Sequence, residues 1–290
     1  MGKTGRSAER GPGRGRRRPH RAPGERLALL PPSGRGTDGR ADRDRRGDRS
    51  CPRRRRSAAG ELSAAVTRIL LTAGPTRAYI DDVRYLTNGS SGRMAVAIAR
   101  AALAAGHDVT IVSGPVAVAY PSKARVVPVV STRDMLAACL VELPRVDGVI
   151  AAAAPCDFEP AARVPGKIPR KGSGLSLVLE PTPDIIATLS RRARPEQWMV
   201  AFALEPGGDP RRALEKIDAK ACDLIVVNDL SAVNAGTTAV AVYDAAHAKV
   251  GERRGTKGAV SSWLVRLIAV HCSTPVTRRP RGRRPAGPQA

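Results

Sequence analysis

The chain has 290 residues, enough for one large α/β domain or two small ones, and it carries a formal net charge of +23. No apolar run is long enough to span a bilayer, and the N-terminus lacks the apolar segment of a secretory signal. The five cysteines include no Cys-x-x-Cys pair, which argues against a zinc site and, with their odd number, favours a reducing compartment. We therefore expect a cytoplasmic protein that does not contact membranes.

The two ends of the chain carry most of its charge. Residues 1–65 hold 19 Lys/Arg against 7 Asp/Glu, and residues 271–290 hold 5 Arg and no acid. Both segments are rich in Arg and Pro and lack a periodic apolar pattern, so we expect both to be disordered. The first is a nucleic-acid-binding tail, a solvated extension, or the product of a start codon assigned too early; we favour the last two readings. Nucleic acid is expected to bind only through these basic ends.

Between the ends, residues 66–270 alternate between short apolar runs and helical patterns, as in one α/β domain. Serines stand ahead of the first helix as cap candidates, Gly106 ends that helix, and Ser131 or Thr132 caps the second. The first half is expected to hold strands at 69–71, 107–112, 125–130 and 147–153, and helices at 94–105 and 132–143. This alternation predicts a doubly wound, Rossmann-like parallel sheet with helices on both faces.

The second half begins with a long segment, residues 155–180, that contains four prolines. A loop of this length inside a compact domain is usually a lid or a binding loop. The remaining elements are expected to be strands at 175–179, 199–203, 223–227 and 238–244, and helices at 183–192, 210–221 and 263–270.

The loop before the first helix is the first candidate site. Its Asn88-Gly89-Ser90-Ser91-Gly92 turn opens the helix, whose free N–H groups and dipole favour an anion. Asn88 can hold a carbonyl or an oxyanion, although Asn-Gly is also a common turn pair. An NAD-binding unit would need Gly-x-Gly-x-x-Gly here and an acid after the second strand, and the chain has neither. A nicotinamide reductase therefore remains a distant alternative.

Two further groups of charged residues are candidates. Asp157, with Lys167, Arg170 and Lys171 downstream, suits a nucleoside triphosphate, since the carboxylate can bind a hydroxyl or a magnesium shell and the cations can bind phosphates. A solvated charged loop is the plain alternative. Lys216 and Lys220 share one helix face, where solvation by water is the default interpretation.

Several short motifs follow one another along residues 68–270: Thr72-Ala73-Gly74-Pro75-Thr76-Arg77, Asn88-Gly89-Ser90-Ser91-Gly92-Arg93-Met94, Val112-Ser113-Gly114-Pro115, Lys167-Ile168, Thr182-Pro183-Asp184-Ile185 and Phe202-Ala203. In this order they resemble the phosphopantothenate–cysteine ligase (phosphopantothenoylcysteine synthetase) family of coenzyme A biosynthesis. The resemblance implies a homodimer that joins 4′-phosphopantothenate to L-cysteine. It implies CTP, or ATP, with Mg²⁺ as the cosubstrate, and an acyl-nucleotidylate intermediate. The flavin-dependent decarboxylase domain often fused ahead of this one is not expected, and neither is flavin.

The resemblance also assigns roles to individual residues. Asn88 would act on the acyl-nucleotidylate, and Lys167 would be needed for catalysis. Six residues fall on nucleotide-binding positions: Ala153, Ala154, Asp157, Phe202, Lys216 and Lys220. Four fall on positions of the substrate loop: Arg84, Ser90, Ser91 and Gly92.

The chain departs from the family pattern in a few places. Gly89 stands where many members have histidine, and Glu180-Pro181-Thr182 replaces a lysine–asparagine pair. Pro169-Arg170-Lys171 interrupts a run of lysines, and the segment 231–238 is shorter than usual. These differences concern how the nucleotide is bound and which nucleotide base is preferred. A nucleic-acid-binding protein that acts through its basic ends is the alternative from a different class.

Overall fold

The computed structural model describes residues 66–170, 172, 174–230 and 235–272, all within one unit of the chain, Leu62–Ala290. The predictions for residues 1–65 and for most of the basic tail lie outside the described residues. So do Lys171 and residues 231–234, half of the shortened segment. No helix in the described part is long and apolar enough to cross a membrane.

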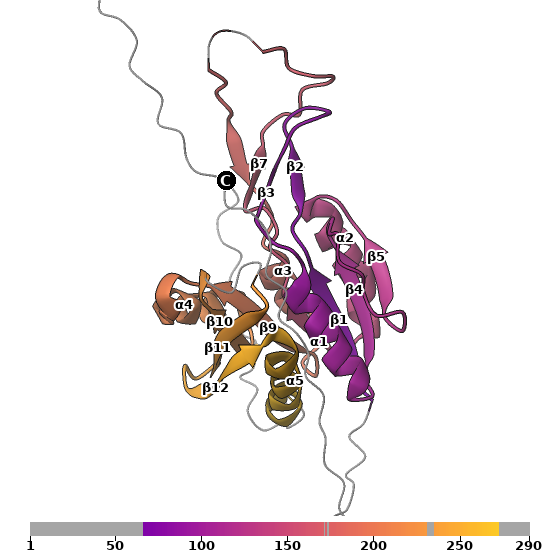
Figure 1. The fold of residues 1–290 in the computed structure, drawn as a ribbon, viewed down its shortest axis with the longest axis vertical. Helices are drawn as coiled ribbons and strands as arrows, with labels where there is room; N and C mark the ends of the chain where they lie inside the picture. The colour runs from indigo at the N-terminus through magenta and orange to yellow at the C-terminus, as the bar shows by residue number, and fades with distance from the viewer. Residues whose placement is uncertain (1–65, 171, 173, 231–234, 273–290) are drawn as a thin grey trace, which may run out of the picture. The chain divides into compact units, whose positions relative to one another are not determined.

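An eight-stranded sheet in the order β12-β11-β10-β9-β6-β1-β4-β5 forms the centre of the fold (Figure 1). Six of its strands are parallel: β1 (Arg68–Ala73), β4 (Asp108–Ser113), β5 (Arg125–Pro128), β6 (Gly148–Ala151), β9 (Trp198–Leu204) and β10 (Leu224–Asn228). By chain order these six run 3-2-1-4-5-6, the arrangement of a dinucleotide-binding fold. The predicted Rossmann-like class is confirmed.

Two antiparallel strands, β11 (Thr237–Asp244) and β12 (Lys249–Thr256), extend the sheet beyond β10. The predicted parallel sheet is therefore extended at this edge into a mostly parallel, mixed sheet. The sequence did not reveal β12 because half of the residues in Lys249–Thr256 are charged and two more are glycines. An exposed edge strand needs no apolar run, since no second layer covers its outer side.

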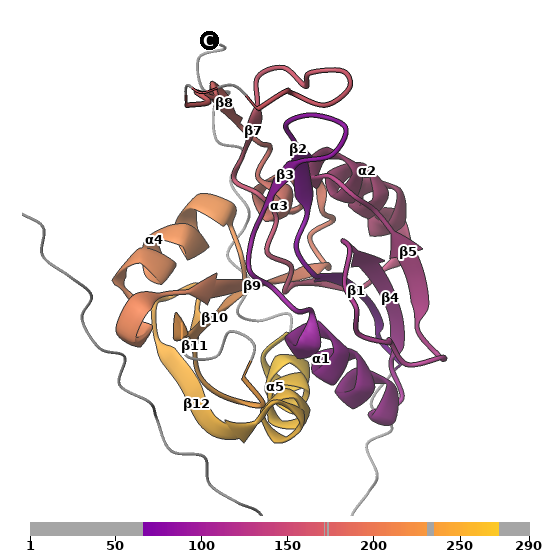
Figure 2. The ribbon, with the colours of Figure 1, turned by 45° about the horizontal axis from the view of Figure 1, so that its top comes forward.

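Five helices cover the two faces of the sheet (Figure 2). Helices α1 (Arg93–Ala104) and α5 (Lys257–Cys272) pack against each other on one face, and α2 (Thr132–Glu142), α3 (Ile185–Arg192) and α4 (Arg211–Lys220) follow one another on the opposite face. Leu71 joins the apolar layer under α1 and α5, whereas its neighbour Leu70 joins the layer under α2 and α3. Both faces of β1 are thus buried, which explains its continuous apolar sequence.

The helix ends confirm some of the predicted caps and correct one. Ser131 caps α2 in a capping box with Asp134, and Gly106 follows the end of α1 with φ +85°. The serines predicted to cap α1 do not do so. The N-cap is Gly92, which has φ +73° and makes no side-chain cap bond. Only glycine adopts this conformation without strain, so it directs the chain into α1 and leaves the first turn without a side-chain acceptor.

Two small hairpins leave the carboxyl ends of β1 and β6, which are neighbours in the sheet (Figure 1). The first pairs β2 (Arg77–Tyr79) with β3 (Tyr85–Thr87), and the second pairs β7 (Phe158–Pro160) with β8 (Leu179–Pro181). The strand predicted at 175–179 was therefore wrong except at its last residue. Alternation alone was misleading here, because the side chains at 175–179 are exposed on both sides.

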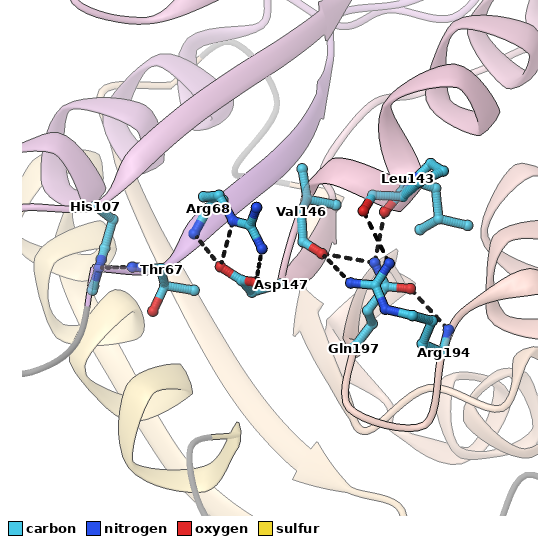
Figure 3. Close-up of polar contacts among 9 residues, drawn as sticks. Thr67, Arg68, His107, Leu143, Val146, Asp147, Arg194 and Gln197 are labelled. Atoms are coloured by element: carbon cyan, nitrogen blue, oxygen red, sulfur yellow. Dashed lines mark hydrogen bonds and ion pairs between the residues drawn. The ribbon is translucent and has the colours of Figure 1, made fainter.

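The amino ends of the central strands are held together by a polar network (Figure 3). Arg68 on β1 donates from Nη2 to Asp147 Oδ1 at 2.6 Å and from its backbone N–H to Asp147 Oδ2 at 2.8 Å. The Gln197 amide donates to the carbonyls of Leu143 and Val146 at 2.6 and 2.7 Å. The hydrogen bond from Arg68 lowers the pKa of Asp147. These contacts hold the amino ends of the central strands together. The candidate site residues gather at the opposite, carboxyl ends of the strands.

Candidate functional site

A cavity of about 710 Å³ opens at the carboxyl ends of the parallel strands. It includes the crevice between β1 and β6, where the strand order reverses and where open α/β sheets bind their ligands. Ten of the twelve predicted site residues line it: Asn88, Ser90, Ser91, Gly92, Ala153, Ala154, Asp157, Phe202, Lys216 and Lys220. The structure thus brings together three groups that are widely separated in sequence.

Asn88 connects the two loops at this crevice. Its amide donates to the carbonyl of Pro155 at 2.8 Å, in the loop that follows β6. The Ser90 N–H donates to the Asn88 carbonyl at 2.8 Å, so Asn88 also makes the local turn that its sequence suggests. At Gly89, a Cβ would meet nothing within 4 Å. A larger side chain, such as the histidine of many relatives, would therefore have room at this position.

A buried network of hydroxyl groups supports the loop after β6. Thr76 Oγ1 accepts from the Cys156 N–H at 2.8 Å and lies 2.9 Å from Thr132 Oγ1. Thr132 Oγ1 in turn donates to the Cys156 carbonyl at 3.1 Å. The Asp157 carbonyl accepts from the Thr182 N–H at 2.9 Å, which ties this loop to the approach to α3. The network fixes the backbone at Cys156 and Asp157, and the exposed Asp157 lines the cavity.

The paired lysines of α4 are not simply solvated. Lys216 Nζ contacts Glu205 Oε1 at 2.5 Å, and Lys220 Nζ contacts Asp184 Oδ2 at 3.1 Å. Glu205 is only 3% exposed, and Asp184 also caps α3 by accepting from the Ala187 N–H at 3.0 Å. The default interpretation of a water-solvated face was wrong, because a separate carboxylate neutralises each lysine. Both acids stand in or beside motifs that carry the family resemblance, but the sequence did not indicate that they pair with these lysines.

Arg84 and Lys167 do not line the cavity. The Arg84 guanidinium contacts Asp81 Oδ2 at 3.1 Å and donates to the Ile168 carbonyl at 3.0 Å, next to the exposed Lys167. Burial would raise the pKa of Asp81, but the N–H groups of Arg84, Val83 and Ile168 outweigh it and lower that pKa. Arg84 therefore holds the segment that carries Lys167. The roles assigned to both residues by resemblance stay predictions.

Two cavity residues, Lys257 and Thr238, were not predicted from the sequence, and they line the cavity together with Arg93 of the Asn88–Met94 motif. Lys257 is the first residue of α5, which begins well before the helix predicted at 263–270. Burial, and then the nearby charge of Arg93, lower the pKa of Lys257. The Thr238 hydroxyl is buried and has no hydrogen-bond partner among the described residues. The only sequence signal for Lys257 was its place just ahead of an apolar helical pattern.

Two possible ligands, a divalent cation and NAD, can be compared with the residues at the site. The described residues contain no cluster of three or more metal-type side chains, so a divalent cation here would need phosphate oxygens beside the Asp157 carboxylate. For NAD, the acid expected after the second strand is replaced by Ser113, whose hydroxyl lies 2.7 Å from Tyr120 Oη. The nicotinamide alternative therefore lacks its ribose ligand.

The model of the DNA/pantothenate metabolism flavoprotein C-terminal domain family matches residues 64–271. The chain belongs to this family. The Coenzyme A biosynthesis bifunctional protein CoaBC of Bacillus subtilis (strain 168) is 41% identical over 169 residues, which cover 58% of this chain and 41% of that protein. A cysteine/cysteine sulfinic acid decarboxylase of an unknown prokaryotic organism is 36% identical over 206 residues, 69% of this chain and 57% of that protein. The chain thus spans about half the length of these curated relatives.

Solved structures agree with the family assignment. The C-terminal domain of a Coenzyme A biosynthesis bifunctional protein CoaBC matches with a TM-score of 0.62 and 34% identity, covering 73% of this chain and 99% of that chain. A Cab2 H337A mutant in complex with phosphopantothenate-cysteine matches with a TM-score of 0.58 over 71% of this chain and 87% of that one. At 16% identity, the second match shows likeness of fold alone. The resemblance to the phosphopantothenate–cysteine ligase family is confirmed for residues 64–271.

Proposed function

We propose that this chain joins 4′-phosphopantothenate to L-cysteine, using CTP and releasing pyrophosphate and CMP, with ATP as the alternative nucleotide. The observation that carries the proposal is the cavity at the strand-order reversal, which collects ten residues that the family resemblance assigns to the nucleotide and the substrate. A Cab2 structure of the same fold holds phosphopantothenate-cysteine, the product of this reaction. A domain of this family is therefore a suitable scaffold for the reaction.

The reaction has two steps. The substrate carboxylate attacks the α-phosphorus, the bond from that phosphorus to the bridging oxygen breaks, and pyrophosphate leaves. The cysteine amine then attacks the acyl carbon, loses a proton, and displaces CMP. Lys216 and Lys220 would hold the nucleotide, and the Asn88 amide would position the acyl carbonyl. Asp157 would hold Mg²⁺ together with phosphate oxygens, and the ion would offset phosphate charge. The scheme uses no flavin.

A homodimer belongs to the proposal. Apolar side chains on the two hairpins and their loops are exposed, with Val83 at 57%, Phe158 at 54% and Val178 at 76%. Contiguous exposed apolar surface favours contact with another protein surface. We propose that two copies pair through these hairpins, and that Lys167 of one copy serves the cavity of the other. The position of Lys167 outside the lining of its own cavity supports this arrangement.

A pyrophosphate-release assay tests the ligase. Release is expected to depend on both 4′-phosphopantothenate and CTP, and mass spectrometry should detect the amide once cysteine is added. Asn88→Ala should accumulate the acyl-cytidylate, because the second step loses the group that positions the carbonyl. Lys167→Gln should lose turnover, whereas Lys123→Gln, an exposed lysine outside the cavity, should not. Wild-type rates in both site variants would show that the residue assignment is wrong.

A further inference from the structure

Basic side chains line the cavity from both faces of the sheet. On the α3 and α4 side, Lys216 and Lys220 each contact a carboxylate. On the opposite face of the sheet, Lys257 and Arg93 stand at the starts of α5 and α1, close enough for the charge of one to lower the pKa of the other. Two like charges at the edge of a partly buried space repel, and an anion between them relieves that repulsion.

Backbone contacts fix the position of Lys257. Its N–H donates to the Gly236 carbonyl at 3.1 Å, which joins the start of α5 to the segment leading into β11. Thr238, two residues further on, lines the same cavity and is 5% exposed. Its buried hydroxyl has no hydrogen-bond partner among the described residues. Because buried hydroxyl groups are normally hydrogen-bonded, this one points to an occupant of the cavity.

The start of α1 contributes further donors on this wall. Gly92 to Ala95 line the cavity, and no side chain caps the helix at Gly92. The wall formed by α1 and α5 therefore combines two cations with helix-start N–H groups, a set of groups that favours a phosphate over a neutral ligand.

We propose that Lys257, together with Arg93, binds the β- and γ-phosphates of the nucleoside triphosphate and holds them as pyrophosphate leaves. The inference rests on the proposed function and adds a residue to it. When the bond from the α-phosphorus to the bridging oxygen breaks, its electron pair moves to that oxygen, so negative charge grows on pyrophosphate. The Lys257 ammonium and the Arg93 guanidinium stabilise this charge without giving up a proton. An anion bound here would also raise the lowered pKa of Lys257.

Calorimetric titration of the full chain tests the proposal, with CTP, CMP and inorganic pyrophosphate as separate ligands. Lys257→Gln should bind CTP and pyrophosphate roughly tenfold to a hundredfold more weakly, the usual loss for a hydrogen bond to a charged group. CMP, which lacks the two outer phosphates, should bind within about twofold of wild type, while Lys257→Arg should recover most of the loss for CTP. Arg266→Gln removes the same charge from an exposed position on α5 and should change nothing.

The outcomes separate this inference from the proposed function. Lys257→Gln with wild-type affinity for CTP and pyrophosphate would overturn it, and so would an equal loss for CTP and CMP. If Lys257→Gln unfolds, Thr238→Val provides the test, with weaker CTP binding and unchanged CMP binding expected. A wild-type chain that binds pyrophosphate through Lys257 but makes no amide would contradict only the proposed ligase. If the wild-type chain and Lys257→Gln form the amide at the same rate, only the role of Lys257 would be contradicted.

Discussion

Glu205 shows how one buried carboxylate can set the position of a binding residue. It lies at the end of β9, is nearly inaccessible to solvent, and contacts the Lys216 ammonium at 2.5 Å. Its backbone N–H donates to the Asn228 carbonyl on the next strand, so the backbone that carries the side chain is held in place. A buried carboxylate needs a cationic partner such as the Lys216 ammonium, because burying an unpaired charge is costly. Glu205 therefore orients Lys216 within the cavity.

Replacing Glu205 by Gln should weaken the grip on the nucleotide without blocking the chemistry. The amide keeps the volume of the side chain but loses the charge that holds Lys216, so we expect the KM for CTP to rise by about tenfold, the usual loss for a charge-assisted hydrogen bond. The kcat should change little. Steady-state kinetics measure both values, with Glu252→Gln on the exposed strand β12 as the matched control. An unchanged KM would show that Lys216 is positioned by other contacts.

At the residue scale, the sequence predicted those residues of the cavity lining that lie near strand ends. Asn88, Asp157 and Phe202 could be placed because buried parallel strands deliver their carboxyl ends to one edge. Lys257 could not, because it follows an exposed edge strand and precedes Gly258, a poor helix former. Whether Lys167 faces a site depends on contacts between loops, which carry no periodic signal.

At the element scale, Asp81 and Asp82 fasten the loop that carries Lys167. Asp81 Oδ2 accepts from the Ile168 N–H at 3.1 Å, and Asp82 Oδ2 accepts from the Gly166 N–H at 2.7 Å. The Gly166 N–H and then Arg163 lower the pKa of Asp82. The pKa of Asp81 is also lowered, against the effect of its burial. The loop is thus held by two carboxylates, which accept hydrogen bonds from its N–H groups most strongly when they are ionised.

The stabilisation of this loop by Asp81 and Asp82 should depend on pH only in the acid range. Because both folded-state pKa values lie below the unfolded value of about 3.9, the stabilisation is complete above that pH and is lost as the pH falls through the folded values. The protection factors at Gly166 and Ile168, which correct exchange rates for the intrinsic pH dependence of amide exchange, should therefore be unchanged from pH 7 to about pH 4 and should fall below it. Asp81→Asn should weaken protection at neutral pH, whereas Asp108→Asn on β4 should not. Protection that is lost near pH 6 would contradict the assignment.

The sequence revealed the elements that are buried on one or two faces and missed those that are not. The parallel strands and all five helices have apolar patterns, although α5 is longer than predicted. Strands β2, β3 and β12 are short or largely exposed, and their pairing comes from backbone hydrogen bonds that any sequence can form. Hairpins of this kind are set by tertiary contacts rather than by periodicity.

At the scale of the whole molecule, sharing of sites between two copies can be tested by mixing inactive variants. A dimer that combines an Asn88→Ala copy with a Lys167→Gln copy has one intact site if Lys167 serves the partner's cavity. Random pairing makes half of the dimers mixed, so about one quarter of the wild-type rate of amide formation should return. Each variant alone is the control. A mixture no more active than its components would place Lys167 in the cavity of its own copy.

The two hairpins are joined to each other as well as to the sheet. Isolated bridges pair Pro75 with Ala154 and Asp81 with Val164, so the excursions after β1 and β6 run in parallel and share their backbone hydrogen bonds. A change in the length of one excursion alone would break this pairing, while the sheet beneath would be unaffected. We therefore expect the two segments to change length together rather than singly. A chimera that takes one of them from a relative must take the other with it.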